Sequence, residues 1–124
     1  MGIKRIRESE EMYLETILLL RQKSANVHSI DVAETLGFAK SSVSRGVNLL
    51  KAKGYITMDH ASGLIEFTEA GRRKAEGVYN RHRVLTAALV KLGADAALAE
   101  ENACRIEHVV SEEMMNVFER FVKS

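Results

Sequence analysis

Residues 29 to 67, SIDVAETLGFAKSSVSRGVNLLKAKGYITMDHASGLIEF, carry the clearest signals of secondary structure in this chain. Its beginning predicts a short helix, Ile30 to Leu36, with Ser29 as the N-cap and Gly37 as the C-terminal stop. After a tight turn, a second helix is predicted over Lys40 to Lys53. Its inward face consists of apolar residues at i, i+4 and i+7, namely Val43, Val47 and Leu50. Two helices joined by a short Gly-containing turn form a helix-turn-helix.

Two β-prone runs follow the second helix. They are Tyr55 to Met58 and Leu64 to Phe67, and the segment between them ends in Gly63, which suits a hairpin turn. A helix-turn-helix followed directly by a β-hairpin is a winged helix, in which the second helix enters the major groove of DNA. The sequence therefore predicts a DNA-binding module.

The outward face of the second helix carries polar side chains suited to DNA: Lys40, Ser41, Ser42, Ser44, Arg45 and Asn48. Hydroxyl groups can bind phosphates, while Arg and Asn can make bidentate contacts with base edges. From Phe38 to Met58 there are four cations and no acid, which favours docking on phosphates. His60 at the wing tip could touch the DNA backbone or minor groove, and it could equally be a solvated loop residue. A solvated polar face on an ordinary helical hairpin is the simpler alternative for the helix.

Apolar spacing predicts further helices on both sides of this module. They are Glu8 to Gln22, Glu69 to Leu92 after a Thr68 cap, Ala96 to Val109, and a last helix capped by Ser111. Three helices after the wing exceed what one small DNA-binding module needs. Their surplus apolar faces indicate a homodimer that reads two half-sites by two-fold symmetry. The expected organisation is a DNA-binding domain over residues 1–70 and a helical domain over residues 71–124.

The segment Cys104-Arg105-Ile106-Glu107-His108 contains three metal-ligand types at i, i+3 and i+4, which share one face of a helix. From Ala94 to Ser124 seven acids face three cations, a balance that suits a cation. Met12 and Glu15 place a thioether and a carboxylate together on the first helix, although a core-edge Met beside a solvated Glu is the plainer interpretation. His82, between two cations, is likewise most often a solvated or hydrogen-bonded residue.

Composition limits the other classes of function. A chain of 124 residues with 46% hydrophobic residues can bury a core, and no apolar run is long enough to span a bilayer. The charged N-terminus lacks the apolar stretch of a secretory signal, so we expect a cytoplasmic protein with no membrane partner. The single cysteine cannot form an internal disulfide. Enzyme motifs are missing, so neither catalysis nor a small-molecule substrate is expected.

Three segments resemble the diphtheria-toxin-repressor (DtxR/MntR) family of metal-dependent transcriptional repressors. They are Glu11 to Ile17, Asn80 to Arg83, and Ala103 to Glu113. The resemblance covers nearly the whole chain, and the last segment is the most specific. It implies a mainly α fold: a winged helix-turn-helix DNA-binding domain followed by a helical metal-binding and dimerisation domain. Because the chain stops after the dimerisation helices, it looks like the short form of the family without the SH3-like domain.

The resemblance also implies site residues. Met12, Cys104, Glu107 and His108 fall on the primary metal site, and Glu15 and His82 on a second site of the manganese-responsive members. Glu100 occupies the position of an ancillary-site His in longer members, and the usual partner position of that His is Thr86 in this chain. In the recognition helix, Ser41, Ser42 and Arg45 match the family's DNA contacts.

The ligand types lead us to expect a repressor that responds to Fe(II) rather than Mn(II). Iron-type members have thioether and thiol at the positions of Met12 and Cys104, and sulfur ligands disfavour Mn(II) relative to Fe(II). Glu15, however, belongs to the manganese pattern, so an Mn(II)-responsive repressor is the alternative. Zn(II), Co(II), Ni(II) or Cd(II) could substitute in vitro. A metal-independent or thiol-sensing winged-helix regulator and a metal enzyme with Glu107 as base are the rivals from other classes.

Overall fold

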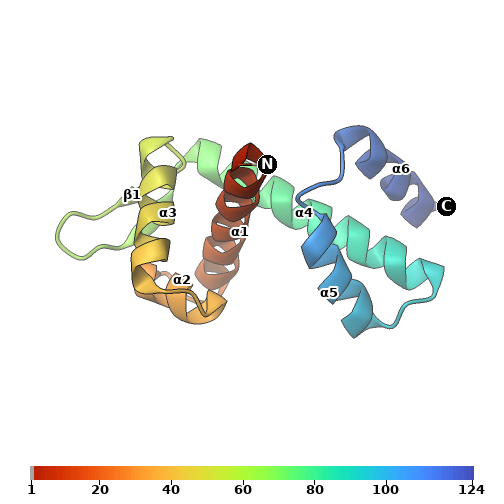
Figure 1. The fold of residues 1–124 in the computed structure, drawn as a ribbon, viewed down its shortest axis with the longest axis horizontal. Coiled ribbons are helices and arrows are strands. Elements are labelled where there is room, and N and C mark those ends of the chain that lie inside the picture. Colours follow the sequence, from red (N-terminus) through yellow and green to blue (C-terminus); the bar gives the residue numbers. More distant parts are fainter. Residues whose placement is uncertain (1) are drawn as a thin grey trace. The chain divides into compact units, whose positions relative to one another are not determined.

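The computed structural model describes residues 2–124, with side chains from Ser9 onward, and consists of helices with one small antiparallel sheet (Figure 1). The elements in chain order are α1 (Gly2–Lys23), α2 (Ser29–Leu36), α3 (Lys40–Ala52), β1 (Ile56–Met58), β2 (Ile65–Phe67), α4 (Glu69–Leu92), α5 (Ala96–Ile106) and α6 (Glu112–Lys123). The chain divides into two compact units, Met1–Glu76 and Gly77–Ser124. None of the described helices is long and apolar enough to cross a membrane.

The first unit packs α1, α2 and α3 around one apolar core. Residues from all three helices are fully buried, among them Leu14, Ile17, Val32, Val43 and Val47. In α1 and α3 they recur at a spacing of three or four, which places them on a single stripe of each helix. Burial of each such side chain stabilises the unit by about 1.5–3 kcal/mol. This packing leaves the opposite stripe of α3 in solvent.

The turn between α2 and α3 depends on Gly37, whose φ of 70° lies in the left-handed region that glycine adopts without strain. The N–H groups of Gly37 and Phe38 both donate to the carbonyl of Ala33 and so end α2. At the other end, the expectation that Ser29 caps α2 is wrong. His28 is the N-cap, because the Asp31 carboxylate accepts its backbone N–H at 2.8 Å, and Ser29 is the first helical residue.

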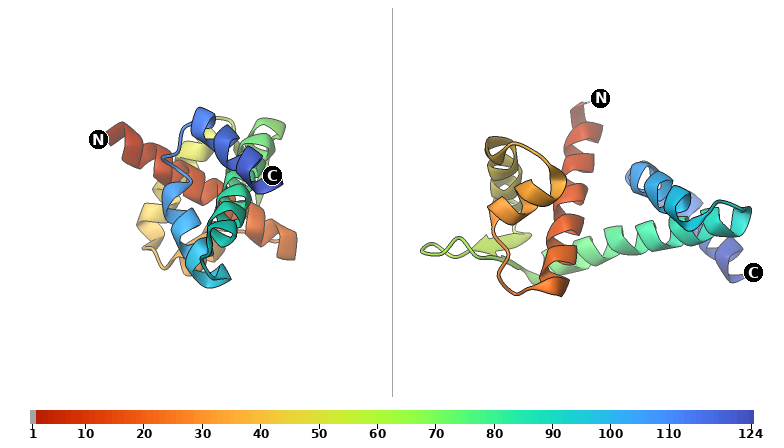
Figure 2. Two further views of the ribbon diagram at one scale, coloured as in Figure 1. Left: turned by 90° about the vertical axis from the view of Figure 1, so that its right-hand side faces the viewer. Right: turned by 90° about the horizontal axis from the view of Figure 1, so that it is seen from below.

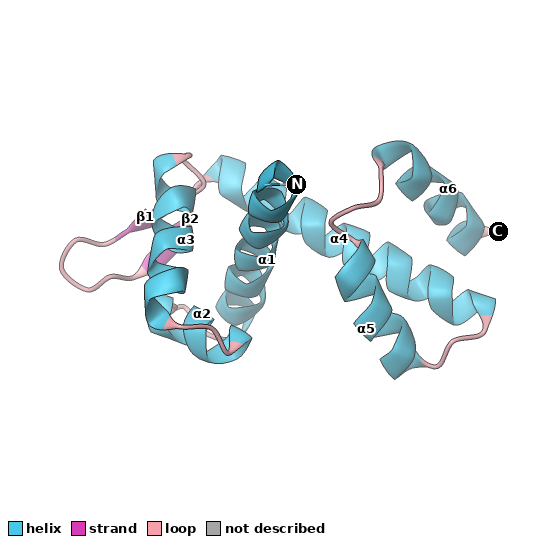
Figure 3. Cartoon of the chain, in the orientation of Figure 1, coloured by secondary structure: helices cyan, strands magenta, loops and turns pink. Residues whose placement is uncertain are grey.

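The wing is the hairpin of β1 and β2, in register Ile56 with Phe67 and Met58 with Ile65 (Figures 2 and 3). Its tip is held by Asp59, whose carboxylate accepts the N–H of Ala61 and both the N–H and the hydroxyl of Ser62. These hydrogen bonds, those from Ser62 above all, stabilise the ionised form and lower the pKa of Asp59 below its ordinary value of 3.8.

Helix α4 begins where the wing ends, as expected from Thr68. The Thr68 hydroxyl accepts the N–H of Gly71 at 3.1 Å and donates to the carbonyl of Gly54. Gly71 is required at this point, because a Cβ there would lie 1.8 Å from the carbonyl oxygen of Tyr55. Close backbone packing thus joins the start of α4 to the first unit. Gly93, at φ 121°, ends α4.

The second unit has a separate small core of Leu85, Ala103 and Met115, with Val84, Leu89, Ile106, Val110 and Phe118 packed against it. Side chains cap both of its shorter helices: Asp95 accepts the N–H of Leu98, and Ser111 accepts the N–H of Met114. Helix α5 ends at Ile106, three residues before the expected end at Val109. The metal-ligand motif therefore straddles the end of a helix.

Candidate metal centre and DNA-reading face

Glu107 is the centre of the candidate metal site in the second unit. Its side chain is fully buried, and its two oxygens face two imidazoles: Oε2 lies 2.7 Å from His82 Nδ1 and Oε1 lies 3.3 Å from His108 Nε2. The two histidines are themselves only 15% and 9% exposed. A carboxylate and two imidazoles therefore meet in a nearly solvent-free place, where charged groups are retained only if they are paired or bind metal.

The local backbone explains how Glu107 meets both its neighbour His108 and the distant His82. Glu107 is the C-cap of α5 but keeps helical dihedrals (φ −58°, ψ −27°), and its N–H donates to the carbonyl of Ala103. The helical spacing from Cys104 to Glu107 is thus preserved, whereas His108 lies in the turn after the helix. Cys104 is exposed in the last turn of α5. His82 reaches Glu107 from α4.

Arg81 holds the turn in place. Its Nε donates to the carbonyl of Glu107 at 2.9 Å, a second nitrogen donates to the carbonyl of Val110, and a third pairs with the Glu112 carboxylate at 2.9 Å. One guanidinium therefore joins α4 to both ends of the α5–α6 connection. From the sequence, Arg81 was recognised only as part of a motif, and this role was not predicted. Nothing in the local spacing could have revealed it, because its acceptors are backbone carbonyls 26 and 29 residues away.

The donor set fits a divalent transition metal. Imidazole nitrogen and carboxylate oxygen are ordinary ligands of such ions, and a carboxylate with an imidazole on each oxygen brings three ligand groups of these two types together. His82 also lines a cavity of about 520 Å³ in the second unit together with Glu100 and Thr86. Thr86 offers only a hydroxyl there, and this hydroxyl donates to the His82 carbonyl. Glu100 itself is exposed.

Met12 and Glu15 belong to the first unit, on α1. Both are half-buried and lie one turn apart, so they share a face of the helix, as expected from their spacing. The neighbouring residues Tyr13 and Leu14 are buried. The face with Met12 and Glu15 thus borders the side of α1 that packs into the core of the first unit.

The predicted DNA-reading residues all lie in solvent. On α3, the predicted contacts Lys40, Ser41, Ser42, Ser44, Arg45 and Asn48 are all exposed, and they alternate with the buried Val43, Val47 and Leu50 at helical spacing. His60 is exposed at the tip of the wing. A cationic helix without acidic residues and a projecting hairpin are the two surfaces by which winged helices meet DNA.

Comparison with known proteins gives the same assignment for both units. Residues 5–64 match the iron dependent repressor N-terminal DNA binding domain, and residues 68–124 match the iron dependent repressor metal binding and dimerisation domain. An HTH-type transcriptional regulator of Methanocaldococcus jannaschii is 30% identical over 118 residues, which is 94% of each chain. The transcriptional regulator MntR of Escherichia coli is 28% identical over 98% of this chain and 81% of its own length.

Longer relatives match as well. The diphtheria toxin repressor of Corynebacterium diphtheriae is 30% identical over 90% of this chain and 50% of its own. A solved manganese-dependent transcriptional repressor in complex with manganese superposes with a TM-score of 0.83 at 28% identity, over 92% of this chain and 52% of that chain. This chain thus spans about half the length of these longer proteins.

These matches confirm the predicted fold class, a winged-helix DNA-binding domain followed by a helical metal-binding and dimerisation domain. They also confirm that the protein is a DNA-binding regulator and not an enzyme. Manganese and iron regulators both occur among the relatives. The chain belongs to the diphtheria-toxin-repressor (DtxR/MntR) family of metal-dependent transcriptional repressors.

Proposed function

We propose that this chain is a homodimeric repressor whose affinity for operator DNA rises when Fe(II) binds, and that it controls genes of metal-ion homeostasis. The observation that carries the proposal is the buried Glu107 carboxylate with His82 on one oxygen and His108 on the other. Residues 1–70 bind DNA in this proposal, and residues 71–124 form the metal-binding and dimerisation domain.

The remaining ligands in this proposal are the residues predicted from the sequence. Met12 and Cys104 complete a primary site with Glu107 and His108, while Glu15 and His82 serve a second site, with Glu100 as a further ligand. When bound, the ion supplies positive charge to the Glu107 carboxylate. The chain's own part is to hold Glu107 in position through Arg81 and to keep the two imidazoles out of solvent. Because metal and operator bind the same conformation, each raises the affinity for the other by the same factor.

The choice of Fe(II) over Mn(II) rests on the sulfur pair, Met12 and Cys104, since thioether and thiolate are softer than the ligands that Mn(II) prefers. A specific observation favours the alternative. Glu15 adds a hard carboxylate on the face of α1 that carries Met12, and solved relatives include a manganese-dependent repressor. Mn(II) is therefore the second candidate metal.

An operator must first be obtained, by selection of duplexes from a random DNA pool with the metal-loaded protein. Binding of that duplex is then titrated anaerobically with Fe(II) and with Mn(II) at matched free concentrations. Met12→Ala, Cys104→Ala and His108→Ala should each abolish the metal response while the fold is retained. Glu101→Gln is the matched control, because Glu101 is an exposed carboxylate on the same helix as Cys104.

The outcomes separate the candidates. A stronger response to Fe(II) supports the proposal, and a stronger response to Mn(II) replaces iron by manganese. If Cys104→Ala keeps the full metal response, Cys104 is not a ligand. Operator binding that is the same with and without metal would overturn the metal-dependent mechanism, and a dependence on thiol oxidation alone would instead favour a thiol-sensing regulator.

A further inference from the structure

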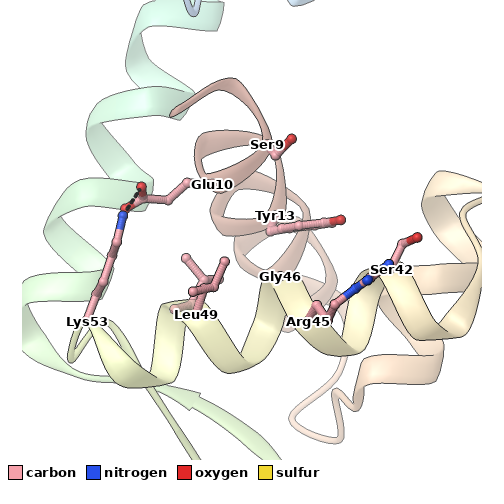
Figure 4. A pocket seen from close by; sticks show the side chains of 9 residues that line it. Ser9, Glu10, Tyr13, Ser42, Arg45, Gly46, Leu49 and Lys53 are labelled. Carbon is pink, nitrogen blue, oxygen red and sulfur yellow. Dashed lines mark hydrogen bonds and ion pairs between the residues drawn. The ribbon is translucent and has the colours of Figure 1, made fainter. Parts of the chain in front are cut away.

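Helix α1 and helix α3 touch at a point where only glycine fits. A Cβ added to Gly46 would lie 2.0 Å from Cε2 of Tyr13, 2.6 Å from Cδ2 and 2.8 Å from Cζ. Figure 4 shows the Tyr13 ring lying across α3 at Gly46, between Leu49 on one side and Arg45 and Ser42 on the other. The ring is only 7% exposed, so it cannot simply turn into solvent to make room.

The Tyr13 ring is also held from the turn between α2 and α3. It packs edge-to-face against Phe38, with the ring centroids 6.4 Å apart and an angle of 82° between the planes. One side chain of α1 therefore contacts both the turn and the second helix of the helix-turn-helix. A shift of α1 must be followed by α3 or must break these contacts.

A second contact between the same helices lies one turn away. The Glu10 carboxylate pairs with Lys53, the C-cap of α3, at 2.8 Å and lies 3.5 Å from Lys74 Nζ. Burial alone would lower the pKa of Lys74, but the Tyr55 hydroxyl and the Glu10 carboxylate outweigh it and raise that pKa. The charged form of Lys74 is thus stabilised, and Glu10 faces two cations.

Between the two contacts the helices stand apart. A cavity of about 350 Å³ is lined by Tyr13, Leu49, Leu50 and Lys53, and Figure 4 shows the Glu10–Lys53 pair at one end of it and Arg45 at the other. Leu49 is 55% exposed in this gap. The α1–α3 interface therefore consists of the shared apolar core and these two contacts, with a cavity beside them.

We propose that the contact between Tyr13 and Gly46 transmits a movement of α1 to the recognition helix α3. We call this contact the joint. The proposal rests on the proposed function, in which Met12 and Glu15 of α1 are metal ligands. Tyr13 directly follows Met12 in the chain, and Gly46 directly follows Arg45, one of the predicted DNA contacts on the exposed face of α3. A displacement of α1 at the metal site is then carried through the ring of Tyr13 to the backbone that bears Arg45. Tyr13 and Gly46 are positioning residues and contact neither metal nor bases.

The test must distinguish transmission of the metal signal by Tyr13 and Gly46 from a role of these residues in packing alone. The measured quantity is the ratio of operator affinities with and without metal, using the selected duplex and the intact protein. In wild type we expect a ratio on the order of 100. Gly46→Ala should lower the ratio about tenfold, while metal affinity without DNA changes less than about threefold. Gly77→Ala is the matched control, since it is also a helical glycine and a Cβ there has no described atom within 4 Å.

A double variant provides the sharper test. Tyr13→Val removes the three ring atoms that a Cβ at position 46 would meet. The double variant Tyr13→Val/Gly46→Ala should therefore have the ratio of Tyr13→Val to within about threefold, and not the sum of the two losses, because both substitutions remove the same contact. If Gly46→Ala does not fold, Tyr13→Val alone still tests the joint, because it removes the contact without adding a clash, and its ratio should also fall.

The proposal is overturned if Gly46→Ala keeps the wild-type ratio. It is also overturned if the variant loses DNA affinity equally with and without metal, which indicates a packing defect, or if Tyr13→Val keeps the wild-type ratio, which shows that the ring is not needed. If wild type itself shows a ratio of one, the metal-dependent mechanism has failed and the joint with it. If wild type shows a ratio well above one and Gly46→Ala leaves that ratio unchanged, only the joint is refuted and the metal-dependent mechanism stands.

Discussion

Replacing Arg81 by methionine should loosen the turn that carries Glu107 and His108. Methionine keeps an apolar stem of similar length but removes all three hydrogen bonds of the guanidinium. The Arg81 side chain is 13% exposed, and two of its acceptors are the backbone carbonyls of Glu107 and Val110. The change therefore releases two carbonyls that no longer have a charged donor.

The size of the effect follows from these contacts. The ion pair with Glu112 contributes little, at most about 1 kcal/mol, because Glu112 is 82% exposed. Each hydrogen bond from a charged donor to a carbonyl contributes about 1.5–3 kcal/mol, but water will partly replace it in a turn at the surface. We expect the free energy of local opening to fall by about 2 kcal/mol, which corresponds to roughly 30-fold faster amide exchange.

Hydrogen exchange of the backbone amides from 107 to 112 measures this directly, and metal affinity is measured on the same variant. Because Arg81 orients the residue that bears the central carboxylate, metal affinity should fall by roughly 10–100-fold. Glu112→Gln is the control that removes only the exposed ion pair, and it should leave both quantities near wild type. Wild-type exchange and wild-type metal affinity in Arg81→Met would refute the role assigned to Arg81.

Three further predictions concern the core, the metal preference and the wing. Leu85→Ala should lower the free energy of unfolding by about 2–5 kcal/mol, measured by urea denaturation at fixed protein concentration, because Leu85 is fully buried in the small second core. The double variant Met12→Asp/Cys104→Glu should shift the operator response from Fe(II) toward Mn(II) in the matched titration, since both soft ligands become carboxylates. Asp59 has a lowered pKa, so its stabilisation of the wing turn is present above pH 3.8 and is lost as the pH falls further. A protection factor of the Ser62 amide, measured relative to intrinsic exchange at each pH, that falls below pH 3.8 and is constant above it would show this.

Local signals were enough to predict the winged helix and the long helix α4. Thr68 and Gly93 lie at the two ends of α4 and act there by local hydrogen bonding and backbone conformation, which sequence displays directly. The buried stripe of α3 was equally visible, because Val43, Val47 and Leu50 recur at helical spacing.

The end of α5 was not predictable in the same way. Residues Glu107 to Val109 continue a helical pattern without a glycine or proline, yet the helix stops at Ile106. The carbonyls of Glu107 and Val110 are taken by Arg81 from another helix, and such long-range pairing leaves no periodic signal. The same limit explains Gly46. In the sequence it is a helical glycine of no evident use, and only the ring of Tyr13 against it shows why a larger residue would not fit.

Two adjacent residues of α1, Met12 and Tyr13, connect the proposed metal site with the contact between α1 and α3. Successive residues of a helix point about 100° apart, so Met12 and Tyr13 face different neighbours although their Cα atoms are separated by only 1.5 Å along the axis. A helix is stiff over that distance. Any movement that brings the Met12 side chain to the metal ion therefore moves Tyr13 by nearly the same amount. If Tyr13 is the joint to α3, no longer chain of contacts is needed between the metal ligand and the recognition helix. Coupling would then be sensitive to the residue at position 46 and insensitive to substitutions elsewhere in the core that leave α1 straight, a pattern that a diffuse network of contacts would not produce.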